Sequence, residues 1–335
     1  MKNLGLLSVG LLGVLGLAIF CPAPAQKNEG ERAMGLRLLV LKVARADAVV
    51  IGKVIGIEKE PVDLKTVEVI GIDWPQRKTR TVSYQVALVK VQENLMGAEN
   101  LTHLKIAFVP RKAVPPPPTA RPFLPKDLDI VQRTTAYPVE LREGEEYLFF
   151  LLKHPGGPYY VGPYYRDVDI VRGLGAPITP TKEIDKAMGI DQTIEQVKKI
   201  TAILANPLAG LKSDKAEVRA QAAVVLVMKF RSRPYFAQQV DEVPIDAEMS
   251  RLILQALAEA DWREKANVDL DVANAVDALE LGPRDGWKHS SVAFAPPRPG
   301  QPSLDSLRLA LHKSFVEWLK GPGKNYRIKK FVAKN

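Results

Sequence analysis

The acidic residues with the spacing best suited to chemistry are Asp167 and Asp169, in the stretch DVDIV. Residues two apart on a strand share a face, so these carboxylates could act as general acid and general base, with His154 as a third member. Such a group would make an envelope hydrolase. The same alternation with Val168 and Ile170 is typical of a solvated strand face. We expect the solvated face and assign no catalytic residue.

The histidines do not form a metal-binding pattern. They are His103, His154, His289 and His312. No two of them lie four residues apart, and the sequence has no HExxH motif. It also has no Walker loop, no G-x-S-x-G elbow and no dinucleotide-binding glycine motif. We therefore predict a protein that is not an enzyme and that carries no metal and no cofactor.

Four tyrosines follow a turn of glycine and proline, HPGGP, at 154–158. They are Tyr159, Tyr160, Tyr164 and Tyr165. Because tyrosine is a good strand former, the stretch is interpreted first as a hairpin. Alternation along a strand still leaves about half of them on the outer face, where tyrosines can stack against sugars or partner side chains. These four are candidate binding residues.

A proline-rich insertion is expected over 110–138, where four consecutive prolines occupy 115–118. Proline cannot donate to a strand ladder and favours an extended polyproline conformation. A loop of this length is either a functional arm or lacks order. If it is an arm, Arg121 and Phe123 are its candidate binding residues.

The first 25 residues predict a signal peptide. Lys2 is followed by an apolar run from Leu4 to Phe20 and by the small-residue pattern Ala23-Pro24-Ala25. Cys21 offers lipid attachment as an alternative, but a lipoprotein site needs a small residue where Phe20 stands. We expect a secreted or periplasmic protein. No later segment reaches the ~20 apolar residues of a membrane-spanning helix, so we predict none after signal removal.

The composition is that of a globular protein, with 46% hydrophobic and 25% charged residues among 335. After a helix expected over 26–45, β-type runs occupy 46–172. They lie at 46–58, 67–72, 83–95, 101–109 and 145–153, followed by short strands. Gly52 and Gly56 are expected to mark bulges in the first strand. Several strands without helices between them predict a small antiparallel barrel.

A linker at 173–190 precedes an all-helical domain expected over 191–320. Pro207 should end its first helix, Asp214 and Glu217 should form a reciprocal cap at the helix after that, and Asp246 should begin another. The remaining residues, 321–335, contain no acid and carry several lysines. We interpret them as a solvated basic tail. Nucleic acid is not expected as its partner, because the protein is expected to be exported and the tail has few aromatic residues.

The stretches ARADAVVIGKVIGIE, YQVALVKVQENLMG and LREGEEYLFFL, with PYYVGP, together resemble the netrin-like, tissue-inhibitor-of-metalloprotease-like version of the OB fold. The resemblance covers about 44–171 and implies an OB-like β-barrel. Those inhibitors coordinate the protease zinc through an N-terminal cysteine. The mature chain expected here has none, so the resemblance does not imply inhibition by that route.

The stretch NPLAGLKSDKAEVRAQAAVVLVMKFR, at 206–231, resembles one HEAT-type unit. Later helices do not repeat its pattern, and a solenoid needs about three or more units. The expected fold class is therefore α+β, with an OB-like barrel followed by a helical domain that contains a HEAT-like helix pair. The expected function is that of an exported binding module whose partner is another extracytoplasmic protein. A barrel that binds oligosaccharide or peptidoglycan is an alternative, as is the hydrolase.

Overall fold

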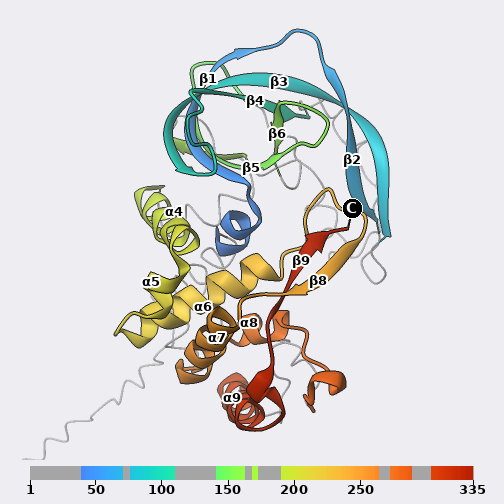
Figure 1. Ribbon diagram of the computed structural model, residues 1–335. Helices are drawn as coiled ribbons and strands as arrows, with labels where there is room; N and C mark the ends of the chain where they lie inside the picture. The colour runs from blue at the N-terminus through green and yellow to red at the C-terminus, as the bar shows by residue number, and fades with distance from the viewer. Residues whose placement is uncertain are drawn as a thin grey trace, which may run out of the picture.

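The computed structural model describes residues 39–70, 76–109, 141–162, 168–172, 190–263, 272–288 and 303–334. Over these residues the protein is a mixture of β-strands and helices, which confirms the predicted α+β class at this level. Figure 1 shows a large sheet at one end of the molecule and the helices at the other. The expected signal peptide, the proline-rich insertion and all but the last residue of the expected linker lie outside the described residues.

The larger sheet is formed mostly by the segments for which the sequence predicts β-structure, although the strands at 62–70 and 76–96 begin earlier than the predicted 67–72 and 83–95. Its strands are β1 Ala48–Ile57, β2 Val62–Ile70, β3 Gln76–Met96, β4 His103–Phe108, β5 Glu146–Lys153, β6 Tyr159–Val161 and β7 Val168–Arg172. Six consecutive residues of β5 are buried, as expected of a strand that is apolar on both faces. The long β3 pairs with β2 over its first part and with β1 and β4 over the rest.

The strand pairings of this sheet lead back to the strand from which they begin. β1 pairs with β3, β3 with β4, β4 with β6, β6 with β5, and β5 again with β1. All of these pairs are antiparallel except β4 and β6, which are parallel. β2 pairs with β3 outside this circuit, and β7 pairs with β5.

The glycines of β1 lie where its pairing becomes irregular, as predicted. The register with β3 shifts between Ile51 and Gly52 and again between Val54 and Gly56. At Gly52 a Cβ atom would lie only 2.5 Å from Cγ1 of Val89 on the neighbouring strand. A side chain here would force the strands apart, so glycine permits the close approach.

The helical half begins with α4. Its helices are α4 Ile190–Ala205, α5 Pro207–Leu211, α6 Ala216–Phe230, α7 Ala247–Glu259, α8 Val272–Ala278 and α9 Leu304–Lys320, with the 3₁₀ turns η2 Pro283–Asp285 and η3 Pro322–Asn325. The predicted end of the first helix before Pro207 is confirmed. Asp246 is the N-cap of α7, as predicted, and its side chain accepts a hydrogen bond from the amide of Met249.

The predicted reciprocal cap of Asp214 and Glu217 is wrong. α6 begins one residue later than expected, with Lys215 as its N-cap and no side-chain capping bond. Arg219 instead donates to the carbonyl oxygens of Ser213 at 2.9 Å and Asp214 at 3.1 Å. Its guanidinium thereby fixes the turn before the helix.

The prediction that the second half is all helical is also wrong. β8 Val240–Pro244 pairs antiparallel with β9 Lys329–Ala333, so residues 329–333 of the basic tail form a paired strand rather than a free, solvated end. Ile328 is fully buried, and Phe331 is 9% exposed beneath the guanidinium of Arg231 at 4.1 Å. These two apolar residues hold the lysine-rich segment on the helical half.

The two halves of the chain share a hydrophobic cluster. It contains residues of the helical segment 39–45, of β1 and β5, and of α4 and α6. Phe150 of β5, Ile200 of α4 and Val225 of α6 are fully buried in it. The helical segment and α4 lie between the sheet and the other helices in Figure 1. The sheet and the helices are therefore packed directly against each other, whereas the predicted division into domains at 46–172 and 191–320 stays a prediction.

Candidate functional site

The first two candidate tyrosines are partly buried and belong to different hydrophobic clusters. Tyr159 packs against the cluster that contains Leu64 and Tyr84, and Tyr160 against the one that contains Val89. Burial raises the pKa of Tyr160 above 10.0. Neither ring lies free on an outer face. Tyr164, Tyr165, Arg121 and Phe123 lie outside the described residues, so the binding role predicted for the whole set stays a prediction.

His154 is buried, and both of its ring nitrogens form hydrogen bonds. Nε2 donates to the carbonyl oxygen of Lys65 at 2.9 Å, and Nδ1 accepts from the amide of Gly156 at 3.0 Å. The ring of Phe236, which follows α6, packs edge-on against it with 4.8 Å between centroids. Burial lowers the pKa of His154 below 6.5. These contacts give His154 a structural role in the turn after β5.

The two candidate carboxylates of the hydrolase alternative lie at the edge of the described structure. Asp169 is in β7, where its backbone is paired opposite Leu148 of β5. Asp167 lies outside the described residues. The arrangement of the predicted catalytic group thus falls outside the described residues, and the role of these carboxylates stays a prediction.

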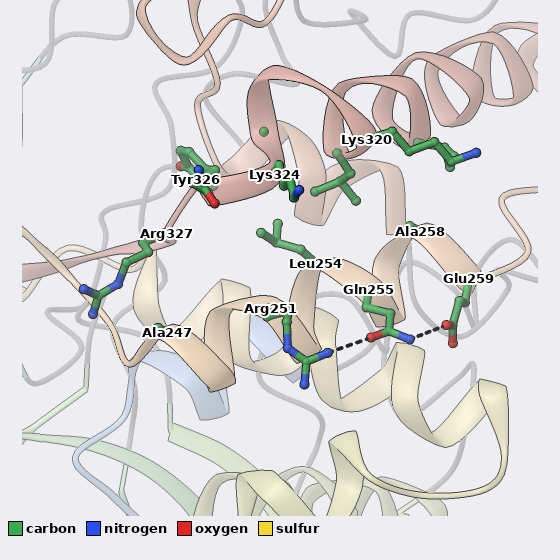
Figure 2. A pocket seen from close by; sticks show the side chains of 14 residues that line it. Ala247, Arg251, Leu254, Gln255, Ala258, Glu259, Lys320, Lys324, Tyr326 and Arg327 are labelled. Carbon is green, nitrogen blue, oxygen red and sulfur yellow. Dashed lines mark hydrogen bonds between the residues drawn. The ribbon is translucent and has the colours of Figure 1, made fainter.

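A hollow in the helical half is better suited to hold a ligand. It lies between α7 and the segment formed by the end of α9, η3 and residues 326–327, and we call it the α7–α9 groove. Its volume is about 580 Å³, which lies within the range of about 300–1,000 Å³ usual for small-ligand sites. Figure 2 shows the groove with the side chains that line it.

The floor of the α7–α9 groove is apolar. Leu254 and Ala258 contribute to it from α7, and Val316 and Leu319 from α9. Tyr326 closes one end and packs edge-on against Trp318 of α9, with 5.2 Å between ring centroids. Burial raises the pKa of Tyr326 to about 12, so its hydroxyl is protonated at neutral pH. The floor therefore presents hydrocarbon and aromatic surface.

Local sequence explains why the chain returns over α7 after α9. Gly321 is the C-cap of α9, and the Gly-Pro-Gly run at 321–323 bends the chain through η3. Gly323 lies directly on the indole of Trp318, where a Cβ atom would be 2.5 Å from the ring. Only glycine fits there without displacing the turn. The close approach places Lys324, Asn325 and Tyr326 over the groove.

Hydrogen bonds join the two walls. Nε2 of His312, on α9, donates to the carbonyl oxygen of Ala258, on α7, at 2.8 Å. Nε of Arg327 donates to the carbonyl oxygen of Ile245, just before α7, at 3.0 Å. The amide of Met249 and, less strongly, the charge of Arg327 lower the pKa of Asp246. These hydrogen bonds therefore hold the two walls of the groove together near both ends of α7.

Basic side chains surround the opening. They are Arg251, Lys320, Lys324 and Arg327, and all four residues are exposed. Within the described part of the chain, Arg251, Lys320 and Lys324 make no ion pair. Nη1 of Arg251 instead donates to Oε1 of Gln255 at 3.2 Å. Positive charge is therefore available to a ligand.

The acidic residue that lines the groove, Glu259, already has cationic and polar partners. Gln255 donates to its Oε1 at 2.7 Å, and Arg219 of α6 donates to its Oε2 at 2.8 Å. The hydrogen bonds from Gln255 and then Arg219 lower the pKa of Glu259 below 4.5. Glu259 is thus held as a carboxylate whose charge is balanced by Arg219. The groove has an apolar floor and a cationic rim, a combination that suits an anionic ligand with apolar groups.

No protein-family model matches this chain, and neither the curated proteins nor the solved structures include one that matches it. Within the described ranges, no group of three or more histidine, cysteine, aspartate or glutamate side chains is placed to hold a metal ion. None of the helices described is long and apolar enough to cross a membrane. The function is therefore inferred from the physical properties of the site.

The sequence contained a partial signal for this site. The basic run around 320–327 stands out, but Lys320 and Lys324 lie far along the chain from Arg251, and the sequence alone favours a solvated tail from 321 onward. The spacing of Gly321, Pro322 and Gly323 is the feature that predicts a sharp turn after the helix. It does not show that the turn folds back onto α7.

Proposed function

We propose that this chain is an exported binding protein without catalytic activity, and that the α7–α9 groove holds its anionic ligand. One observation carries the proposal. Among the described residues, four cations line the groove, and the carboxylate that lines it, Glu259, is balanced by Arg219. Exposed cations attract an anion. The attraction becomes stronger when the ligand displaces water from the neighbouring apolar surface, because the local dielectric constant falls.

The proposed ligand belongs to another extracytoplasmic protein. Export is supported by the charged start, apolar run and small-residue pattern of the first 25 residues. Outside the cytoplasm, a binding module of this kind meets proteins of the same compartment.

We further propose that the sheet is an OB-like β-barrel and that α5 and α6 form a HEAT-like pair. The circuit of pairings β1–β3–β4–β6–β5–β1 supports the first point, because a barrel is a sheet whose last strand pairs with its first. The short α5, the turn at Ser213 and Asp214 and the buried apolar face of α6 support the second. In this proposal the barrel supports the helical half through the shared cluster.

The two alternatives have less support. For a hydrolase, the buried His154 would have to release its bonds to Lys65 and Gly156 to transfer a proton. For a glycan-binding barrel, Tyr159 and Tyr160 would have to leave the clusters against which they pack. The cations of the α7–α9 groove require no such rearrangement.

The proposal is tested by titrating the full-length chain with oligoglutamate in a calorimeter at about 0.1 M salt, where charges are screened beyond about 10 Å. A double charge reversal, Lys320→Glu with Lys324→Glu, removes two exposed cations that have no ion pair in the described structure. We expect it to weaken binding by about tenfold or more, since each lost charge contact is worth up to about 1 kcal/mol and each new glutamate adds repulsion.

The matched control is Lys53→Glu with Lys153→Glu, which makes the same change in net charge at exposed positions of β1 and β5. We expect this variant to bind within about twofold of the original chain, because charges beyond about 10 Å are screened. Equal weakening in both variants would mean that net charge, not the groove, attracts the anion. Absence of binding to the unaltered chain would refute the proposed function.

A further inference from the structure

The cations of the α7–α9 groove are spread along it and do not converge on one point. In Figure 2, Arg327 lies at one end near Tyr326, Arg251 lies across the groove below Lys324, and Lys320 lies toward the other end. They come from different elements, since Arg251 is in α7, Lys320 ends α9 and Lys324 is in η3. A single phosphate or carboxylate head group could reach only part of this set. The arrangement is suited to a ligand with several separated negative charges.

Apolar surface lies between these charges. Leu254 is only 4% exposed and forms the middle of the floor, with Val316 and Leu319 on the facing helix. A purely polar polyanion would leave this surface without a partner. A ligand with aliphatic side chains between its carboxylates would remove the surface from water, which stabilises the complex by about 25 cal/mol for each Å² buried.

The walls themselves indicate the shape of the ligand. Two helices held together by the bond between His312 and Ala258 form a groove of the kind that receives an amphipathic helix. An amphipathic helix presents apolar residues at positions i, i+3, i+4 and i+7, and acidic residues beside that stripe can reach a cationic rim.

We propose that the ligand of the α7–α9 groove is an acidic amphipathic helix of a partner protein. The helix places its apolar stripe on Leu254, Val316 and Leu319. Its flanking carboxylates pair with the rim cations Arg251, Lys320, Lys324 and Arg327. This assignment rests on the proposed function, because it specifies which anionic ligand the same groove accepts.

Nucleic acid fits the groove less well. Single-stranded nucleic acid needs aromatic faces on which bases can stack. The aromatic residue that lines the groove, Tyr326, is half-buried and packs edge-on against Trp318. An anionic lipid has one charged head and so matches one end of the rim only. Both are outcomes that the experiment distinguishes.

The experiment compares designed peptides of about 14 residues, long enough to form a helix of about four turns. The first peptide has leucines at helical spacing and glutamates beside them. The second has the same composition in scrambled order, which destroys the stripe but keeps the charge. The third replaces every glutamate with glutamine. Oligoglutamate, dodecyl phosphate and a single-stranded oligonucleotide complete the set, and affinities are measured with the full-length chain by fluorescence anisotropy or calorimetry.

We expect the first peptide to bind at least about tenfold more tightly than the scrambled and the glutamine peptides, because each lacks one of the two interactions. Lys320→Glu with Lys324→Glu should reduce that affinity about tenfold, and Lys53→Glu with Lys153→Glu should leave it within about twofold. Leu319→Ala gives an independent variant. It should weaken the leucine–glutamate peptide and leave the affinity for oligoglutamate unchanged.

Other results overturn the inference. If oligoglutamate and the leucine–glutamate peptide bind equally and both depend on Lys320 and Lys324, the proposed function stands and the amphipathic helix is wrong. If dodecyl phosphate or the oligonucleotide binds at least tenfold more tightly than any peptide, the helix is again wrong. If no anion binds, both proposals fail.

Discussion

Arg219 of α6 donates to the carboxylate of Glu259 at the end of α7, with 2.8 Å between Nη2 and Oε2. The pair connects two helices and also determines the charge of the α7–α9 groove. Without Arg219, the carboxylate would offset one of the rim cations and repel an acidic ligand. The charge of the groove therefore depends on a residue that is not part of its lining.

This relationship predicts opposite effects for the two partners. Glu259→Gln should strengthen binding of an acidic peptide by about two- to fivefold, because it removes a negative charge from the lining. Arg219→Gln should weaken it by about the same factor. Both changes should lose their effect as salt is raised toward about 1 M, where screening acts within about 3 Å. Calorimetric titrations at low and high salt measure this, and effects of the same sign in the two variants would contradict it.

The turn after α9 predicts a steric effect at Gly323. Gly323→Ala would place a Cβ atom 2.5 Å from the ring of Trp318. We expect a loss of about 1–3 kcal/mol in the free energy of unfolding, typical of overpacking at a close contact. Acidic-peptide affinity should also fall, since Lys324 follows directly. Denaturant unfolding and peptide titration measure the two effects.

Gly282→Ala is the control for Gly323. Its backbone is extended, with φ −133° and ψ −177°. An added Cβ atom would meet nothing closer than an oxygen of Asp285 at 4.0 Å. We expect little change in stability or affinity. Equal destabilisation by the two substitutions would show that the contact with Trp318 is not the cause.

The buried imidazole of His154 predicts a dependence of stability on pH. Burial lowers its pKa below 6.5 in the folded protein, so the unfolded chain binds the proton more tightly. The free energy of unfolding should therefore fall as the pH decreases through about 6.5 toward the lowered pKa. His154→Gln should flatten this part of a profile of melting temperature between about pH 5.5 and pH 7.5. The same slope in the variant and in the unaltered protein would refute the assignment.

The shared cluster predicts that the sheet and the helices unfold together. Ile200→Ala would leave a cavity between α4, β1 and β5, at a cost of about 2–5 kcal/mol. Global hydrogen exchange of amides in β5 and in α6 should then accelerate by the same factor. Acceleration confined to α4 and α6 would mean that the sheet is an independent unit.

The parts of the fold that could be predicted from sequence are those with strong local patterns. The apolar runs of β1 and β5 predicted strands correctly, and Pro207, the first residue of α5, predicted the end of α4 correctly. β8 could not be predicted in this way, since four of its five residues are exposed and it ends in Pro244. It exists because β9 lies beside it, and β9 is positioned by the burial of Ile328 and Phe331.

The candidate site could not be predicted for a related physical reason. A groove requires two distant segments to come together, and the Gly-Pro-Gly turn predicts only that the chain bends. The sequence points to the tyrosines and His154 because aromatic and histidine side chains often bind ligands. In the structure, Tyr159 and Tyr160 pack against hydrophobic clusters, and His154 is buried and hydrogen-bonded. Cations on separate helices become a site only through tertiary structure.

Hydrogen–deuterium exchange of the full-length chain, with and without the leucine–glutamate peptide, is the most direct test of the proposed binding site. We predict protection of the backbone in α7 from Arg251 to Glu259 and in 320–327, with no change in the turn and strand from His154 to Val161. The protection should disappear with Lys320→Glu and Lys324→Glu. Protection of 154–161 with α7 unchanged would place the binding site on the sheet and contradict the proposal.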